Sequence, residues 1–180
     1  MVTVDPIFVF LSTGFIAFLW ISSSVQKFSS LSHHRLTVEG YGLLPGGLVP
    51  AFAVIQPILE FVLGLLILIP FLRVVSALCS VGLLALYSVA IGINLLRGRR
   101  DIDCGCTGPA MRQELTEGLI IRNLALIGLG LVAALPVASR ALGWIDLVTL
   151  ILGMVGMILV HMAGNLVLAQ APISRLIKGH

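Results

Sequence analysis

The sequence has little charge and few cysteines. Only 11% of its 180 residues are Asp, Glu, Lys or Arg, against about 25% in a typical soluble domain. Three cysteines are too few for the disulfide framework of a small secreted domain. The chain is instead 58% hydrophobic with a mean hydropathy of +1.11, more apolar surface than a soluble core of this size can bury. Lipid must therefore surround much of the chain.

Apolar segments of membrane length are abundant. A hydrocarbon core about 30 Å thick needs roughly 20 apolar residues per helix, and five segments meet this length, at residues 6–24, 48–72, 74–96, 118–138 and 144–169. In lipid each backbone polar group must be paired within its segment, which favours helices. We expect an all-α, polytopic membrane helix bundle in which residues 1–180 form one integral domain. The first segment lacks a preceding Lys or Arg and a small-residue cleavage site, so a retained helix is expected rather than a signal peptide.

Basic residues gather on one side of this expected bundle. Five spans put the termini on opposite sides, and the side of the C-terminus then carries Lys27, Arg35, Arg97, Arg99, Arg100, Arg112, Arg175 and Lys178. The other side carries Arg73 and Arg140. The positive-inside rule makes the richer side cytoplasmic and places the N-terminus outside, in the inner membrane of a cell. Such clustering sets orientation in the lipid bilayer, and no nucleic-acid role is assigned.

The loop Cys104-Gly105-Cys106 is the strongest candidate for chemistry. Two thiols separated by one glycine can close only a small, strained ring, and glycine supplies the backbone angles that closure needs. Strained, exposed disulfides are the labile or catalytic kind. Positive charge upstream favours thiolates, whereas two nearer aspartates oppose them. The supporting residues of this loop are Arg97, Arg99, Arg100, Asp103, Gly105 and Pro109, and unreactive loop cysteines are the plain alternative.

A metal site is a second alternative for this loop. Zinc usually takes four ligands, and His33 and His34 lie in a loop expected on the same side as Cys104 and Cys106. Adjacent histidines diverge, however, and paired zinc cysteines are usually spaced more widely. Cys79 is expected about 35 Å from Cys104 at the helical rise, too far for disulfide exchange, and is interpreted as a small buried hydrophobic residue.

Ionisable residues within the apolar segments mark a second candidate site. Glu60 and His161 are expensive to place in a membrane, and Gln56 and Asn165 lie one turn from them on the same helix faces. We expect a polar cleft that opens beneath the cysteine loop and narrows toward Glu60 and His161. Its members are Lys27, Gln56, Glu60, Asn94, Arg122, Asn123, His161 and Asn165. Hydrogen bonding between helices is an equally strong explanation of these residues.

Several motifs together resemble one family. The run from Asn94 to Pro109, Arg122-Asn123-Leu124, Lys27-Phe28, Tyr41-Gly-Leu-Leu-Pro45 and Glu60 resemble the methylamine-utilisation protein MauE family over residues 7–136, and the helices look like the DoxX-type four-helix membrane fold. The resemblance implies an accessory role with a thioredoxin-like, MauD-type partner. Their client would be a disulfide-rich protein such as the small subunit of methylamine dehydrogenase, and Cys104 and Cys106 would be the redox pair.

The function expected from these features is thiol-disulfide exchange. This exchange proceeds through a mixed disulfide between one of the two cysteines and the partner. A quinone in the polar cleft could reset the pair, with His161 or Glu60 relaying protons. The alternatives are a non-catalytic membrane scaffold that holds partner and client together, and a Cys/His metal-handling site. The resemblance implies client work outside the cytoplasm, whereas the arginine distribution places the loop inside.

Overall fold

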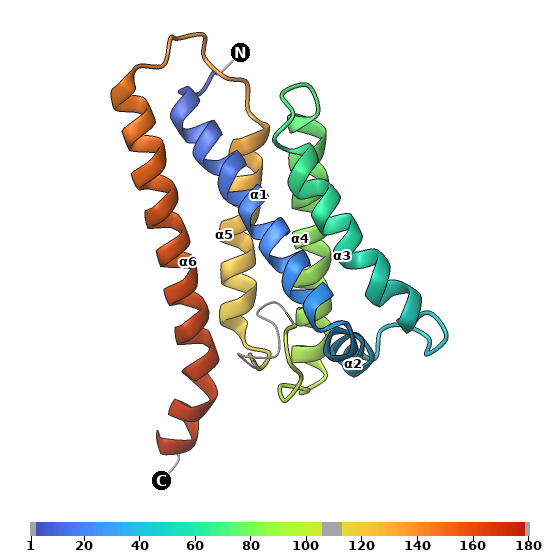
Figure 1. Cartoon of the computed structure of the whole chain (residues 1–180). Coiled ribbons are helices and arrows are strands. Elements are labelled where there is room, and N and C mark those ends of the chain that lie inside the picture. Colours follow the sequence, from blue (N-terminus) through green and yellow to red (C-terminus); the bar gives the residue numbers. More distant parts are fainter. Residues whose placement is uncertain (1–2, 106–112, 179–180) are drawn as a thin grey trace.

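The computed structural model describes residues 3–105 and 113–178, and all regular structure in that part is helical. Its helices are α1 (Pro6–Ser29), α2 (Leu31–Tyr41), α3 (Val49–Leu66), α4 (Arg73–Leu96), α5 (Glu117–Ala134) and α6 (Trp144–Lys178) (Figure 1). Five of them, all except α2, are long and apolar enough to cross a membrane. The predictions of an all-α fold and of five membrane helices are confirmed.

Four helices form a closed ring around the core. α1 packs against α3 and α5, and α4 packs against the same two helices from the other side. The buried core includes Phe15, Trp20, Leu63, Leu84 and Leu126. The indole Nε1 of Trp20 donates a hydrogen bond to Ser80 Oγ at 2.9 Å, which satisfies the one polar atom of the largest core side chain.

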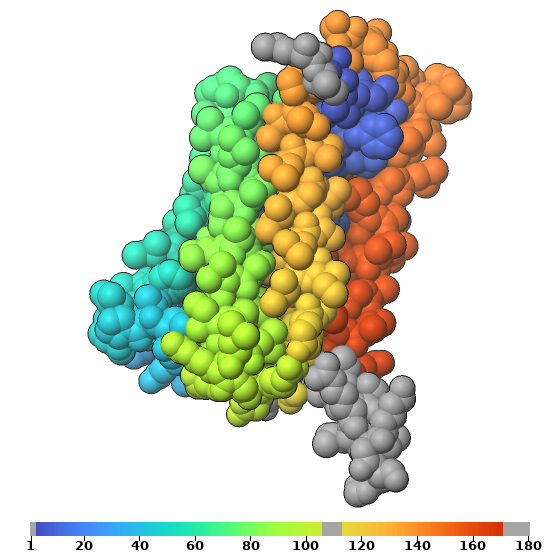
Figure 2. All heavy atoms as spheres, turned by 180° about the vertical axis from the view of Figure 1, so that it is seen from behind, coloured from blue at the N-terminus to red at the C-terminus, as the bar shows by residue number. Residues whose placement is uncertain are grey.

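Helix α6 lies outside this ring against α1, as Figures 1 and 2 show. None of its membrane-length window is buried by the rest of the chain. Small residues permit the contact, since a Cβ on Gly153 would meet Leu11 at 2.9 Å and one on Gly14 would meet Met154 at 2.5 Å. Close approach of this kind is how membrane helices gain packing energy. The likeness to the DoxX fold stays a prediction.

The two ends of the bundle differ in content. The N-terminus and the α5–α6 connection lie at one end, and α2, the cysteine loop and the C-terminal part of α6 lie at the other (Figure 1). At the first end Arg140 pairs with both Asp5 and Asp146 at 2.9 Å, which ties the start of α6 to the start of α1. The termini therefore lie at opposite ends, as five crossings require.

Several helix boundaries differ from the expected ones. α1 continues to Ser29, and α3 ends at Leu66, where residues 67–72 form turns. α5 ends at Ala134, and Val4 pairs with Val137 in an isolated bridge. Pro136 cannot continue a helix, and a reversal between antiparallel helices needs a turn even where its residues are apolar. Hydropathy alone does not register either effect.

Cys79 corrects one expectation. It is exposed, not buried, because Ser76 and Ser80 one turn apart face the interior and leave Cys79 on the outer face of α4. That face is directed at lipid in a membrane protein.

Candidate functional site

Helix α2 occupies a polar segment that the hydropathy pattern predicts to be a loop. It begins directly after α1 and ends at Gly42, which takes a left-handed conformation with φ 60°. Its residues His33, Thr37 and Tyr41 are spaced by four, so they share one face. That face is turned toward the cysteine loop.

The cysteine loop is anchored to α2 at several points. Tyr41 Oη donates to the carbonyl oxygen of Cys104 at 3.5 Å, and Arg99 donates to the carbonyl oxygen of Gly40 at 2.9 Å. Gly105 has φ +71°, and a Cβ there would meet Thr37 Cγ2 at 2.7 Å. Glycine is therefore required at position 105 both by backbone angle and by space.

Asp103 organises the same loop. Its Oδ1 accepts hydrogen bonds from the backbone N–H groups of Gly105 and Gln113, each at 3.2 Å. Its Oδ2 lies 3.1 Å from Nε2 of His33. The Cys104 N–H donates to the Gln113 carbonyl at 2.7 Å, and residues 103 and 114 form an antiparallel bridge. Asp103 therefore ties together the backbone on both sides of the loop and joins it to His33 on α2.

The arginines upstream of the cysteines are also placed. Arg100 forms a forked ion pair with Glu117, at 2.5 and 3.2 Å, and this pair raises the pKa of the Arg100 guanidinium. Arg99 is attached to Gly40. These contacts fasten the N-terminal end of the loop to α2 and to the start of α5. Arg97 follows the end of α4 directly.

A cavity of about 220 Å³ lies beneath the loop, and Cys104 and Gly105 form part of its wall. Cys104 itself is only 8% exposed. The remaining wall is largely apolar and comes from α2, α3, α4 and the α2–α3 connection, including Val38, Leu44, Phe52, Ala90 and Ile91. Lys27, His34, Gln56 and Tyr87 add polar atoms. This cavity lies beneath the loop, where a polar cleft is expected, but its wall is largely apolar.

His34 is the unexpected polar member of this cavity. It is 5% exposed, and neither ring nitrogen has a hydrogen-bond partner within residues 3–105 and 113–178. Burial lowers the pKa of His34 to about 4, with the positive charge of Lys27 acting in the same direction. Its imidazole is therefore neutral at neutral pH, with one donor and one acceptor nitrogen.

A buried polar cluster closes the inner side of the cavity. Lys27 forms an ion pair with Glu60, which is 0% exposed. Glu60 also accepts hydrogen bonds from Ser23 at 3.0 Å and from Tyr87 at 2.5 Å. Gln56 donates to Tyr87 at 2.8 Å. A buried carboxyl group needs several such partners to offset the loss of its hydration.

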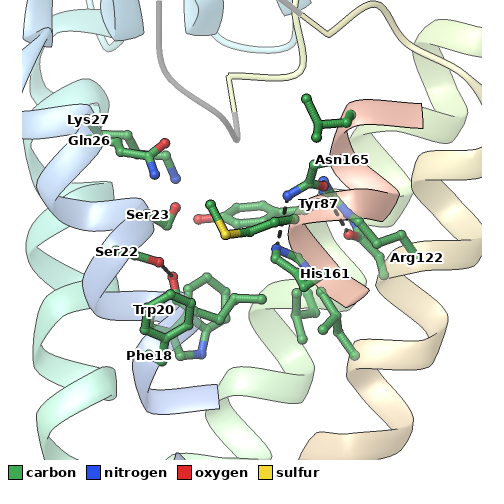
Figure 3. A pocket seen from close by; sticks show the side chains of 16 residues that line it. Phe18, Trp20, Ser22, Ser23, Gln26, Lys27, Tyr87, Arg122, His161 and Asn165 are labelled. Carbon is green, nitrogen blue, oxygen red and sulfur yellow. Dashed lines mark hydrogen bonds between the residues drawn. The ribbon is translucent and has the colours of Figure 1, made fainter. Parts of the chain in front are cut away.

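The other predicted cleft residues form a second group. Arg122 donates to Asn165 Oδ1 at 2.8 Å, and Asn165 Nδ2 lies 3.1 Å from His161 Nε2. With Asn123 these residues line a cavity of about 310 Å³ between α1, α4, α5 and α6 (Figure 3). In Figure 3 Lys27 lies across the cavity from Arg122 and Asn165, with Tyr87 between the two sides, and Lys27 and Tyr87 line the first cavity as well.

The expected single cleft is therefore two cavities that share Lys27 and Tyr87. Glu60 and His161 do not share a cluster, because α3 and α6 flank the bundle on opposite sides of α1 (Figure 1). Asn94 is buried and donates to the Ala90 carbonyl at 3.1 Å within its own helix. Cys106 and Pro109 lie outside the described residues.

The two histidines considered as metal ligands have different surroundings in the structure. His33 is engaged by Asp103, whereas His34 lines the cavity with Cys104. Among the described residues, no three His, Cys, Asp or Glu side chains gather as a metal would require. The structure thus gives the two histidines different environments, as their adjacent positions in a helix predict.

These features define a multi-pass membrane helix bundle with a cysteine loop seated over an intramembrane cavity. Comparison with known proteins agrees: the family model described as methylamine utilisation protein MauE matches residues 5–136. The chain belongs to the MauE family. The match covers α1 to α5 and ends before α6.

Relatives of the chain include three proteins named methylamine utilization protein MauE. The one from Methylophilus methylotrophus is 34% identical over 90% of this chain and 86% of its own length. That from Paracoccus versutus is 30% identical over 81% and 78%. That from Methylorubrum extorquens is 33% identical over 76% and 75%. No solved structure matches the chain.

Proposed function

We propose that the chain is a membrane accessory protein of methylamine utilisation that performs thiol-disulfide exchange through Cys104 and Cys106. Its partner would be a thioredoxin-like, MauD-type protein, and the client a disulfide-rich protein such as the small subunit of methylamine dehydrogenase. The observation that carries the proposal is the seating of Cys104: helix α2 holds its loop, Gly105 takes a positive φ, and Asp103 accepts from the Gly105 N–H.

The burial of Cys104 suggests a division of work within the pair. A soluble partner has little access to a sulfur atom in a residue that is 8% exposed. We therefore assign contact with the partner to Cys106 and resolution of the mixed disulfide to Cys104. The Cys106 thiolate attacks the partner's disulfide and releases one partner thiolate. The Cys104 thiolate then attacks Cys106, the mixed disulfide breaks, and the partner leaves as a dithiol while the pair is oxidised.

The direction of this exchange can also run in reverse, since each step is reversible. In either direction two electrons move between the pair and the partner. The arginine-rich end of the bundle favours a cytoplasmic position for the cysteine loop in an inner membrane. Maturation of a client outside the cytoplasm would require the loop on the outer side instead. Labelling Cys104 and Cys106 in intact cells with a membrane-impermeant thiol reagent, before and after reduction, decides the side.

Client maturation tests the proposal against a non-catalytic scaffold. In cells that also make the partner and the client, a Cys104→Ser/Cys106→Ser variant is expected to bind the partner but to abolish maturation of the client disulfides. Cys79→Ser is the matched control, because Cys79 lies on the outer face of α4. Full maturation by the double variant would establish the scaffold instead. Equal loss in a His33→Ala variant with normal disulfide chemistry would favour metal handling.

A further inference from the structure

The cavity beneath the cysteine loop has an unused hydrogen-bonding group. His34 is buried in its wall with both ring nitrogens unpartnered among the described residues. Leaving such a group unsatisfied costs free energy, typically on the scale of a lost hydrogen bond. Gln56 is a weak partner of the ring: its side chain acts on His34 as a hydrogen-bonding group that raises the pKa, but it does not reach hydrogen-bond geometry with either ring nitrogen, and its amide nitrogen donates to Tyr87 and Glu60. An occupant with a polar atom opposite His34 would satisfy the ring.

The rest of the wall selects for an apolar, ring-sized occupant. Phe52, Leu44 and Ile91 supply apolar surface, and the volume of about 220 Å³ exceeds the roughly 150 Å³ that holds a benzene ring. It is too small for a whole lipid. Leu86 and Leu43 belong to the same wall and are 56% and 37% exposed, so the cavity borders the outer surface of the bundle, where a hydrocarbon tail can leave into lipid.

We propose that this cavity binds the ring of a lipid-soluble quinone, with a quinone carbonyl oxygen accepting a hydrogen bond from His34 and the ring lying beside Cys104. A neutral imidazole suits both forms of the ligand, because the nitrogen that faces the ligand donates to a quinone carbonyl in one tautomer and accepts from a hydroquinone hydroxyl in the other. The cavity lined by His161 is less suitable, because the Nε2 of that histidine already has Asn165 as a partner.

The redox consequence rests on the proposed function of the cysteine pair. Cys104 and Cys106 as a dithiol lose two electrons and two protons and form the S–S bond, and the quinone gains both and becomes a hydroquinone. When the exchange runs in the direction that oxidises the partner, it leaves the pair as a dithiol, and the bound ring is the oxidant that restores the disulfide. Lys27 and Tyr87 line both cavities. They therefore lie between the proposed quinone site and the cavity lined by Arg122, His161 and Asn165.

Binding is tested separately from thiol chemistry. The full chain in lipid nanodiscs, in a Cys104→Ser/Cys106→Ser background, is titrated with a short-tailed benzoquinone, and binding is followed by radiolabel and by the rise in thermal stability. We expect saturable binding that weakens about tenfold in His34→Leu, the effect of one lost buried hydrogen bond. Ala90→Leu fills the cavity and is expected to weaken binding at least as much. Val89→Leu is the control, because Val89 is 58% exposed on the same helix.

The outcomes separate the two proposals. Undiminished binding in both Ala90→Leu and His34→Leu, or no saturable binding at all, overturns the quinone site even if partner exchange proceeds. Should Ala90→Leu fail to fold, Leu86→Trp at the exposed edge of the cavity replaces it. Loss of binding in the cavity variants alone supports the site. If the native cysteines then stay reduced with quinone bound, the thiol chemistry is contradicted and the binding site stands.

Discussion

A Cβ atom on Gly105 would lie 2.7 Å from Cγ2 of Thr37, so the cysteine loop and helix α2 touch at a point where only glycine fits. Three glycines have positive φ in the described part of the chain, at 42, 98 and 105. Gly98 has nearly the same φ, +72°, yet no atom lies within 4 Å of its Cβ position. Comparing Gly105 with Gly98 therefore separates the effect of the contact with Thr37 from the effect of the left-handed backbone angle.

Gly105→Ala is therefore expected to destabilise the protein more than Gly98→Ala. Each change should cost about 1–2 kcal/mol from the left-handed backbone, and only Gly105→Ala adds the clash with Thr37. Thermal unfolding in detergent measures both. Adding Thr37→Ser to Gly105→Ala removes the methyl group that clashes with the new Cβ atom. This double variant should regain part of the stability that Gly105→Ala loses relative to Gly98→Ala. Equal melting temperatures for the two alanine variants would show that α2 does not constrain the loop.

Lys27 and Glu60 should depend strongly on each other. Removing one member leaves an uncompensated buried charge, so Lys27→Met is expected to cost about 3–5 kcal/mol, and Lys27→Met/Glu60→Gln should recover much of this loss. Denaturant unfolding in detergent measures Lys27→Met, Glu60→Gln and the double variant. Arg100→Ala is the exposed comparison and should change stability little, since Arg100 and Glu117 are both exposed. Additive effects at Lys27 and Glu60 would argue against the pair.

Stability should fall in mild acid because of His34. Folding lowers the pKa of this ring from 6.5 to about 4, so the unfolded chain binds the proton more readily. The contribution is intact above pH 6.5 and is lost as the pH falls toward 4, by on the order of 3 kcal/mol. Lys27 and His33 favour the neutral ring and Glu60 opposes them.

The variant that tests this pH effect is His34→Gln. Unfolding measured from pH 7.5 down to about 4 should show a shallower decline for His34→Gln than for the native chain. Val89→Leu, a change at an exposed apolar position, is the control and should keep the native decline. The same slope in His34→Gln as in the native protein would mean that other groups carry the acid sensitivity.

Arg122 should hold the C-terminal half of α6 against the bundle. Its hydrogen bond to Asn165 is 2.8 Å long, and Gln113 also donates to the Asn165 carbonyl at 3.2 Å. We expect Arg122→Leu to loosen this half of α6, seen as faster hydrogen exchange there, with a stability loss of about 1 kcal/mol. Arg140→Ala, at the other end of α6, should affect the N-terminal half instead. Unchanged exchange in both variants would contradict this account of α6.

The membrane helices could be predicted because lipid demands apolar segments of a fixed length. The loop and the polar residues Gln56, Glu60, Arg122 and Asn165 could be singled out because such groups are rare in membrane spans. Helix α2 could not be found by hydropathy, since it is short and polar. Its signal is the four-residue spacing of His33, Thr37 and Tyr41, which becomes informative only with the loop beside it.

The sequence also could not predict that two cavities take the place of the single expected cleft. The sequence places Glu60 and His161 within apolar spans, but the position of a residue along its helix does not tell which helices are neighbours. In the structure α1 contacts both α3 and α6, and its residues Ser23 and Lys27 engage Glu60. His161 packs instead edge-on to Phe15, with ring centroids 5.6 Å apart. The arrangement of α3 and α6 around α1 therefore determines that Glu60 pairs with Lys27 and not with His161.

The central claim is that Cys104 and Cys106 cycle between dithiol and disulfide, and trapping with the partner tests it most directly. The purified chain is mixed with the oxidised thioredoxin-like partner, quenched with acid and analysed by non-reducing electrophoresis and peptide mass spectrometry. Cys104→Ser should accumulate a stable mixed disulfide through Cys106, whereas Cys106→Ser should not, and the native chain should yield an intramolecular disulfide. Absence of any mixed disulfide in Cys104→Ser, with a native pair that stays reduced, would contradict the account.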